Sequence, residues 1–220
     1  MDKFTVVTSG MDRRCLLRED QNATDAAFIA FVDRPQRSKI WQQRPVYNQF
    51  SAPERNHVAH KILIHQFVES NYSLWLDKNI SLKIPVQILV GHWLAHHDIA
   101  VFASRRWNCI GDYACVSAAR RHDDPNSIMD QFLMCVRGGL SEESGMAESC
   151  IVLRRHTMNI EAFNSHWWSE FCRYSTLDEL SFMYAAHRTG IKINVVPHDD
   201  RNDAFFSFGG ESSQSNMPPA

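Results

Sequence analysis

The 220-residue sequence lacks the short motifs that mark several large enzyme classes. It contains no Gly-x-x-x-x-Gly-Lys-Ser/Thr loop, which counts against a P-loop nucleotidase. No Gly-x-Gly-x-x-Gly follows the first apolar run, and the Gly-x-Ser-x-Gly turn of an α/β-hydrolase does not occur. Apolar runs of membrane-spanning length are missing as well, so we expect no transmembrane segment.

The sequence also has little net charge and no paired-cysteine motif. The net charge is −2 at pH 7 and Lys and Arg form no block, so we expect no nucleic-acid partner. The six cysteines form no Cys-x-x-Cys pair and lie mostly in apolar surroundings, as reduced cysteines do. Residues 1–10 lack the features of a secretory signal, and together these observations predict a cytoplasmic protein. The cysteines are Cys15, Cys109, Cys115, Cys135, Cys150 and Cys172.

Short apolar runs alternate with amphipathic segments along most of the chain. Strands are expected at residues 3–8, 26–32, 72–76, 99–103, 148–153 and 191–196. Helices are expected at residues 51–69, 85–97, 109–121, 125–136, 158–174 and 177–187. This alternation predicts one α/β domain with a mostly parallel sheet covered by helices. We place the domain at residues 1–198 and expect residues 199–220, which are rich in Asn, Asp, Gly, Ser and Pro, to form a flexible tail.

The most distinctive local feature is the run Ser73-Leu74-Trp75-Leu76-Asp77. It is an apolar strand that delivers a carboxylate into a turn, and such a carboxylate can bind a hard divalent cation through oxygen. The cation would bridge a nucleotide diphosphate and neutralise charge on the leaving group. On spacing alone, an Asp that simply begins a turn is the better interpretation of Asp77, because Asp is common at that position.

Two arginine pairs each follow an expected strand. Arg105 and Arg106 follow residue 103, and Arg154 and Arg155 follow residue 153. If these strands are parallel, both pairs lie at the same sheet edge as Asp77, where ligands of α/β sheets bind. Arginines placed there can clamp a diphosphate with two hydrogen bonds each, although a single Arg is more often a surface charge.

The eleven histidines suggest a zinc site only weakly. His92 and His96 share a helix face, but Trp93 stands where the metalloprotease pattern needs a Glu as general base. We expect His57 and His60 to face outward or to cap neighbouring groups. A zinc hydrolase is therefore the third interpretation of this sequence, behind those given below.

Several segments together follow the order of a known family pattern. The matching segments are Arg55, Lys61 and His65; Ser73 to Ile80; Arg106, Cys109 and Asp112; Gln131; Gly139-Leu140; Leu153-Arg154-Arg155-His156; Trp167-Trp168-Ser169-Glu170; and Ser175 to Phe182. In this order they resemble the glycosyltransferase-like group long catalogued as domain of unknown function 616. Its plant members are associated with cell-wall and mucilage polysaccharide synthesis. The resemblance covers roughly residues 3 to 198.

The resemblance implies a nucleotide-diphospho-sugar transferase fold of the A type, a single Rossmann-like α/β domain with a mixed central sheet. In that fold an Asp-x-Asp-like turn holds Mn²⁺ or Mg²⁺ against the donor diphosphate. By resemblance, Asp77 is the metal-binding carboxylate and His198 completes the metal site. Asp178 is the catalytic residue, the acidic group nearest the acceptor or the transferred sugar.

Further site residues follow from the same resemblance. Those expected to bind donor phosphate are Arg55, Lys61, Lys78, Arg106 and Arg155. Those expected to bind acceptor or sugar are Trp168 and Glu179. This sequence departs from the family pattern at Lys78, where a Gly is usual. It also departs beside Asp178, where Leu177 and Glu179 replace an Arg and a Gln.

The expected function is transfer of a sugar from a nucleotide-diphosphate donor to an acceptor hydroxyl, in polysaccharide or glycoconjugate synthesis. The expected partners are a nucleotide sugar and a carbohydrate or glycoconjugate acceptor. The alternative is a catalytically inactive binding or scaffold protein of the same fold. The donor sugar, the acceptor, the stereochemical outcome and the oligomeric state stay open at this point.

Overall fold

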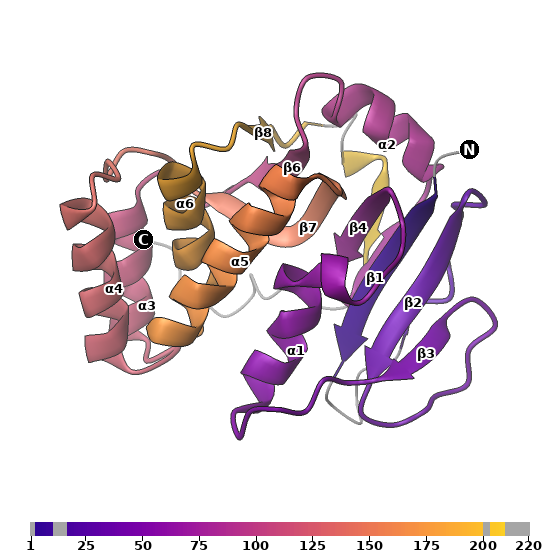
Figure 1. Cartoon of the computed structure of the whole chain (residues 1–220), viewed down its shortest axis with the longest axis horizontal. Coiled ribbons are helices and arrows are strands. Elements are labelled where there is room, and N and C mark those ends of the chain that lie inside the picture. Colours follow the sequence, from indigo (N-terminus) through magenta and orange to yellow (C-terminus); the bar gives the residue numbers. More distant parts are fainter. Residues whose placement is uncertain (1–2, 11–16, 200–202, 210–220) are drawn as a thin grey trace.

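The computed structural model describes residues 3–10, 17–199 and 203–209. A seven-stranded sheet with the order β3-β2-β1-β4-β7-β6-β8 forms its centre (Figure 1). The strands are β1 (Phe4–Gly10), β2 (Ala26–Val32), β3 (Gln42–Pro45), β4 (Tyr72–Leu76), β6 (Ile99–Ala103), β7 (Ala147–Arg155) and β8 (Ile193–Val196). Strand β7 runs antiparallel to both of its neighbours, β4 and β6, while the other six strands share one direction. The predicted mixed, mostly parallel sheet is therefore confirmed.

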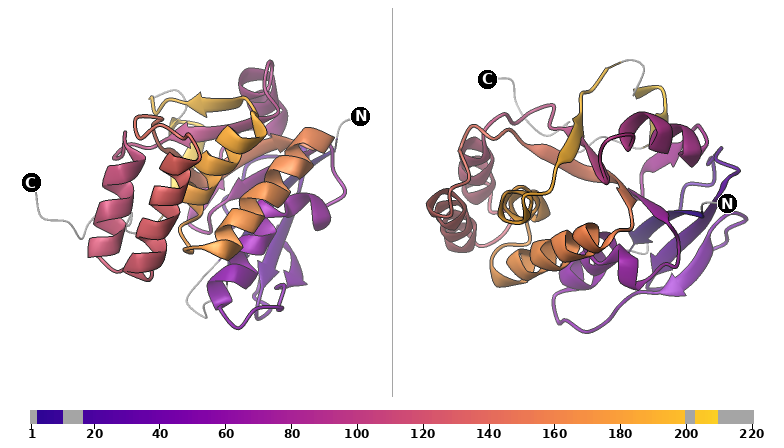
Figure 2. Two further views of the ribbon diagram at one scale, coloured as in Figure 1. Left: turned by 60° about the vertical axis from the view of Figure 1, so that its left-hand side comes forward. Right: turned by 45° about the horizontal axis from the view of Figure 1, so that its top comes forward.

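Helices cover both faces of this sheet. They are α1 (Pro53–Ile62), α2 (Val86–Trp93), α3 (Ile110–Ala119), α4 (Pro125–Arg137), α5 (Met158–Arg173) and α6 (Asp178–Thr189). One apolar core lies between the sheet, α2 and a small second sheet, and another lies between the opposite face, α1, α5 and α6. Helices α3 and α4 lie beside α6 and share a third core with it (Figure 2).

Each strand supplies both cores because successive side chains point to opposite faces. In β1, Val6 packs in the first core and Val7 in the second. In β4, Leu74 and Trp75 divide in the same way. Burial on both faces explains why these strands appear in the sequence as continuous apolar runs rather than alternating ones.

The structure contains three strands that the sequence pattern does not predict. β3 is a polar edge strand, and β5 (Ile80–Leu82) and β9 (Phe206–Phe208) are three residues each. β5 and β9 pair antiparallel with each other and form the second sheet. Because β9 belongs to the segment 199–220 and buries Phe206, the expectation of a flexible tail is wrong for residues 206–208. Residues 200–202 and 210–220 of that segment lie outside the described residues.

Two smaller expectations can be compared with the structure. Cys109, Cys115, Cys135, Cys150 and Cys172 are free thiols, whereas Cys15 lies outside the described residues. Among the helices of residues 3–10, 17–199 and 203–209, none combines the length and the apolar character needed to cross a membrane.

Candidate functional site

At one end of the central sheet, the carboxyl ends of six strands lie beside the amino end of β7. Asp77 follows β4, Ser104 follows β6, His198 lies just beyond β8, and Glu148 is near the start of β7. These four residues line a cavity of about 520 Å³. Small ligands of α/β sheets bind at this edge, and the volume is in the range of small-molecule sites.

The carboxylate of Asp77 is fixed at the floor of this cavity. The indole Nε1 of Trp75 donates a hydrogen bond to Asp77 Oδ1 over 2.8 Å, and the Asp77 amide donates to the carbonyl of Cys150 over 2.9 Å. Burial raises the pKa of Asp77, against the opposing effect of Lys61. Asp77 therefore presents its second oxygen from a rigid position.

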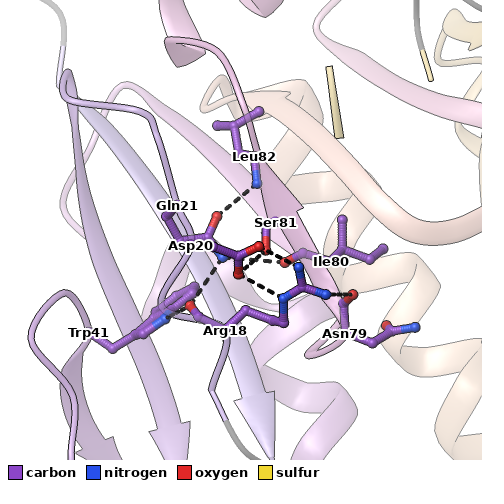
Figure 3. A network of polar contacts seen from close by, with 8 residues as sticks. All are labelled: Arg18, Asp20, Gln21, Trp41, Asn79, Ile80, Ser81 and Leu82. Carbon is purple, nitrogen blue, oxygen red and sulfur yellow. Dashed lines mark hydrogen bonds and ion pairs between the residues drawn. The ribbon is translucent and has the colours of Figure 1, made fainter. Parts of the chain in front are cut away.

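A segment from the N-terminal part of the chain holds the turn that carries Asp77 (Figure 3). Asp20 accepts a hydrogen bond from Ser81 Oγ over 2.7 Å, and the Gln21 side chain accepts one from the Leu82 amide over 2.8 Å. Arg18 donates to the carbonyl of Asn79 over 3.4 Å and also pairs with Asp20. These contacts anchor the residues directly after Asp77, so the turn is part of the rigid scaffold.

A buried ion pair lies behind Asp77. Lys61 Nζ, from α1, is 2.6 Å from Asp178 Oδ2, at the start of α6, and donates to Ser149 Oγ of β7 over 2.6 Å. Burial alone would lower the pKa of Lys61, but the carboxylates of Asp178 and Asp77 outweigh it and raise that pKa. Burial likewise opposes ionisation of Asp178, yet Lys61 holds the pKa of Asp178 below its usual value. Lys61 and Asp178, which the resemblance assigns to phosphate binding and catalysis, therefore lie close to Asp77 but are not among the residues that line the cavity, and their roles stay predictions.

Glu179 lines the cavity beside this ion pair. Its Oε2 accepts a hydrogen bond from the hydroxyl of Tyr113 over 3.0 Å, and its Oε1 lies 3.3 Å from Ser149 Oγ. Burial and the neighbouring Asp178 raise the pKa of Glu179 to about 8. Tyr113 and Ser149 are absent from the sequence prediction. The polar Ser149, which directly precedes the apolar run Cys150–Leu153, is the feature that could have indicated it.

His198 lies on the wall of the cavity formed by β6 and β8. Its ring stacks on Phe102 with 4.4 Å between ring centroids. Its Nδ1 is 3.1 Å from Asp203 Oδ1, and its Nε2 is 3.4 Å from Glu148 Oε2. The cavity therefore brings together Asp77 and His198, the two residues expected to bind a metal. Across the part of the chain that the structure describes, no group of three or more His, Cys, Asp and Glu side chains is arranged to hold a metal ion.

Arg155 lies at the opposite edge of the sheet, so its expected place beside the donor phosphates is wrong. Strand β7 is antiparallel, and Arg155 at its carboxyl end pairs with Tyr72 at the amino end of β4. The Arg155 guanidinium contacts Asp98 Oδ1 at 3.1 Å and donates to the carbonyl of Leu94. The expectation assumed that β7 is parallel to its neighbours. Because β7 runs the other way, its last residues lie at the end of the sheet opposite to the cavity.

Of the two histidines of α1 that were expected to face outward or to cap neighbouring groups, His60 is buried and His57 is half-buried, and both bond to neighbouring groups. His57 Nδ1 is 2.8 Å from Ser9 Oγ, and burial together with nearby Lys61 lowers the pKa of His57 to about 4. The ring of His60 stacks on Phe31, and its Nε2 accepts a hydrogen bond from the amide of Tyr47 over 2.8 Å. Burial also lowers the pKa of His60, to about 3. The two side chains join α1 to β1 and β2.

The other expected site residues divide into two groups. Arg106 lines the cavity, with its guanidinium carbon 4.8 Å from the ring centroid of Trp107. Lys78, Arg55 and Trp168 are not among the residues that line it. Lys78 is exposed on the turn after Asp77, Arg55 is half-buried in the first turn of α1, and Trp168 packs edge-on against Phe50.

Comparisons with known proteins show which sequences this chain resembles. The family model of the TOD1/MUCI70 glycosyltransferase-like domain matches residues 18–208. The "Probable hexosyltransferase MUCI70" of Arabidopsis thaliana is 27% identical over 176 residues, which cover 74% of this chain and 30% of that protein. The "Alkaline ceramidase TOD1" of the same plant is 22% identical over 160 residues, which cover 67% of this chain and 35% of that protein. This chain thus matches about a third of each relative.

Among solved structures, the apo form of the bifunctional glycosyltransferase WbbM aligns with 89% of this chain and 39% of its own chain. The TM-score of this alignment is 0.49 and the sequence identity is 9%.

Proposed function

Because this chain belongs to the TOD1/MUCI70 glycosyltransferase-like domain family, we propose that it transfers a sugar from a nucleotide-diphosphate donor to an acceptor hydroxyl. The observation that carries the proposal is the fixed carboxylate of Asp77 at a cavity that Arg106 and His198 also line. A carboxylate, a guanidinium and an imidazole around one small cavity suit a diphosphate and its counterion. The relative MUCI70, named a probable hexosyltransferase, supports a hexose as the transferred group.

The donor set fits a divalent cation that completes its coordination with substrate oxygens. Mg²⁺ is commonly bound through one or two carboxylates plus phosphate oxygens and water. Asp77 has one oxygen held by Trp75 and one left for such a cation, and His198 lies on the same cavity. Bound Mn²⁺ or Mg²⁺ would neutralise charge on the leaving diphosphate.

Side chains of the protein itself would assist departure of the diphosphate. Arg106 lines the cavity and can donate two hydrogen bonds to phosphate oxygens. Lys61 is already bonded to Asp178 and Ser149, so it would stabilise the diphosphate only by long-range electrostatic attraction from behind Asp77. Fixed charges of this kind are effective because they need no reorganisation during the reaction.

The proposal is tested with a panel of UDP- and GDP-linked hexoses and pentoses in the presence of Mn²⁺. We expect one donor to bind by calorimetry and to release nucleoside diphosphate when mixed saccharide acceptors are added. Asp77→Asn should weaken donor binding at least tenfold, or about 1.4 kcal/mol. Asp98→Asn, at the opposite edge of the sheet, is the matched control and should bind donor as the wild type does.

Two other outcomes correspond to other functions. Donor binding without release of nucleoside diphosphate, across the whole panel, would identify a binding protein of this fold. The relative TOD1 is named an alkaline ceramidase, so ceramide hydrolysis is measured in parallel. Hydrolysis of ceramide together with no donor binding would overturn the proposal.

A further inference from the structure

Two adjacent carboxyl groups at the start of α6 lie in different environments. Asp178 contacts Lys61 at 2.6 Å and is not among the residues that line the cavity. Glu179 lines the cavity together with Tyr113. A group that exchanges a proton with a substrate must be within hydrogen-bond reach of it. Glu179 meets this requirement through its position, whereas Asp178 lies behind it.

The hydrogen bonds that the Ser149 hydroxyl can make show which of the two carboxyl groups carries a proton. A serine hydroxyl has one proton to donate and two lone pairs to accept with. Lys61 donates to this oxygen over 2.6 Å, and the Ser149 proton goes to Asp178 Oδ2 over 2.8 Å. Glu179 Oε1, at 3.3 Å, can then bond to Ser149 only by donating a proton of its own. The geometry thus favours a neutral Glu179 beside an ionised Asp178.

The charges around Glu179 lead to the same assignment. The titratable groups that face it are Asp178 on its own helix, Lys61 of α1, Tyr113 of α3, Cys150 of β7 and, through Lys61, Asp77 after β4. One cation is thus surrounded by three carboxyl groups. Burial and Asp178 accordingly raise the pKa of Glu179 to about 8. Pairs of carboxyl groups whose pKa values are pushed apart in this way commonly divide acid–base roles.

We propose that Glu179, and not Asp178, is the group that accepts the proton of the acceptor hydroxyl. We further propose that, of these two carboxyl groups, Glu179 is the one that is protonated in the resting protein. The catalytic part of this inference rests on the proposed glycosyl transfer. As the acceptor oxygen bonds to the anomeric carbon, the bond from that carbon to the diphosphate oxygen breaks. Its electron pair leaves with the diphosphate. Glu179 releases its resting proton to solvent before this step, and the acceptor proton then passes to the Glu179 carboxylate.

Glu179→Gln is the decisive variant because an amide retains the contacts of the neutral acid. Its oxygen can accept from Tyr113 and its NH₂ group can donate to Ser149. We expect it to bind the UDP- or GDP-linked sugar selected in the panel as the wild type does. Transfer to hydroxyl acceptors should fall by about 10²- to 10⁴-fold, the usual effect of losing a general base. Transfer to azide, which has no proton to give up, should remain.

Two comparisons separate a catalytic role from a structural one. Wild-type transfer to hydroxyls should rise with pH until Glu179 is ionised, and the variant should not show this rise. Asp178→Asn disturbs Lys61 and Ser149, so it should impair transfer to azide as well as to hydroxyls. The inference is overturned if Glu179→Gln keeps hydroxyl transfer within about threefold, or if it loses azide transfer to the same extent.

A spectroscopic measurement that needs no catalytic turnover tests whether Glu179 is protonated in the resting protein. Infrared difference spectra between wild type and Glu179→Gln at pH 7 should contain a protonated carboxyl band that the Asp178→Asn difference lacks. Absence of that band overturns the resting-proton assignment. A wild type that turns over no sugar nucleotide but shows the band refutes the glycosyl-transfer proposal and the base role, while the proton assignment holds.

Discussion

Lys61 Nζ of α1 lies 2.6 Å from Asp178 Oδ2 of α6, so one buried ion pair joins two helices beneath the cavity. Removing one partner of such a pair leaves an uncompensated buried charge, which costs roughly 3–5 kcal/mol. We expect Lys61→Met to lower the free energy of unfolding by about 3 kcal/mol at pH 7, measured by urea denaturation.

The double variant Lys61→Met with Asp178→Asn isolates the interaction. Its destabilisation should be smaller than the sum of the single losses by at least about 1 kcal/mol, because the two residues are in contact. The half-exposed pair Arg155–Asp98 is the control, and Asp98→Asn should cost less than about 1 kcal/mol. Additive losses at Lys61 and Asp178 would show that the ion pair does not couple the helices.

The regular elements could be predicted because buried strands and amphipathic helices differ in their apolar pattern. The six expected strands and six expected helices are all present. The strand Gln42–Pro45 was missed because an edge strand can be polar, and Phe206–Phe208 was missed because it lies among polar residues. Both are held by pairing with distant segments, which a local pattern does not reveal.

The candidate site was predictable where a residue follows a parallel strand. Asp77 was placed at this end of the sheet by this argument and His198 only by resemblance, and both line the cavity. Arg155 was misplaced because an apolar run has the same composition whichever way the strand runs. Tyr113 was missed because its role depends on the packing of α3 beside α6, which no local pattern fixes.

The reversed strand gives a prediction about arginine. Arg106→Gln removes a side chain that lines the cavity, and we expect donor affinity to fall about tenfold, since hydrogen bonds to charged groups contribute roughly 1.5–3 kcal/mol. Arg155→Gln should leave donor affinity unchanged, because Arg155 lies at the far edge of the sheet. Calorimetry with the selected sugar nucleotide measures both. Equal weakening by the two substitutions would contradict this placement.

The small second sheet gives a prediction about stability. Phe206 is 1% exposed and packs against Trp93 and Phe102, with ring centroids 5.9 and 6.0 Å away. Phe206→Ala should lower the free energy of unfolding by about 3 kcal/mol, as is usual when a buried Phe is truncated. Phe208, two residues along the same strand and 47% exposed, is the matched control. Phe208→Ala should cost less than about 1 kcal/mol, and similar losses for both would mean that residues 206–208 do not join the core.

The raised pKa of Glu179 predicts how stability depends on pH. Its pKa is about 8 in the folded protein against an ordinary value of 4.5, so the folded state binds more protons than the unfolded state between these values. The free energy of unfolding therefore falls as pH rises through this window and levels off above it. We expect the loss to be on the order of a few kcal/mol.

Glu179→Gln removes this titration, so its stability relative to wild type should increase from pH 5 to pH 8 in urea denaturation series, the window that the pKa of Glu179 sets. Glu143→Gln, which removes an exposed carboxylate, is the control and should follow the wild-type curve. The two carboxyl groups at the start of α6 act oppositely here, because Lys61 lowers the pKa of Asp178. Asp178→Asn should therefore lose stability relative to wild type as pH rises through the acid range up to and just past the ordinary Asp pKa of 3.8, and should show no further relative change above it. If the free energy of unfolding of Glu179→Gln changed with pH as that of the wild type does between pH 5 and pH 8, the proton would be on a group other than Glu179.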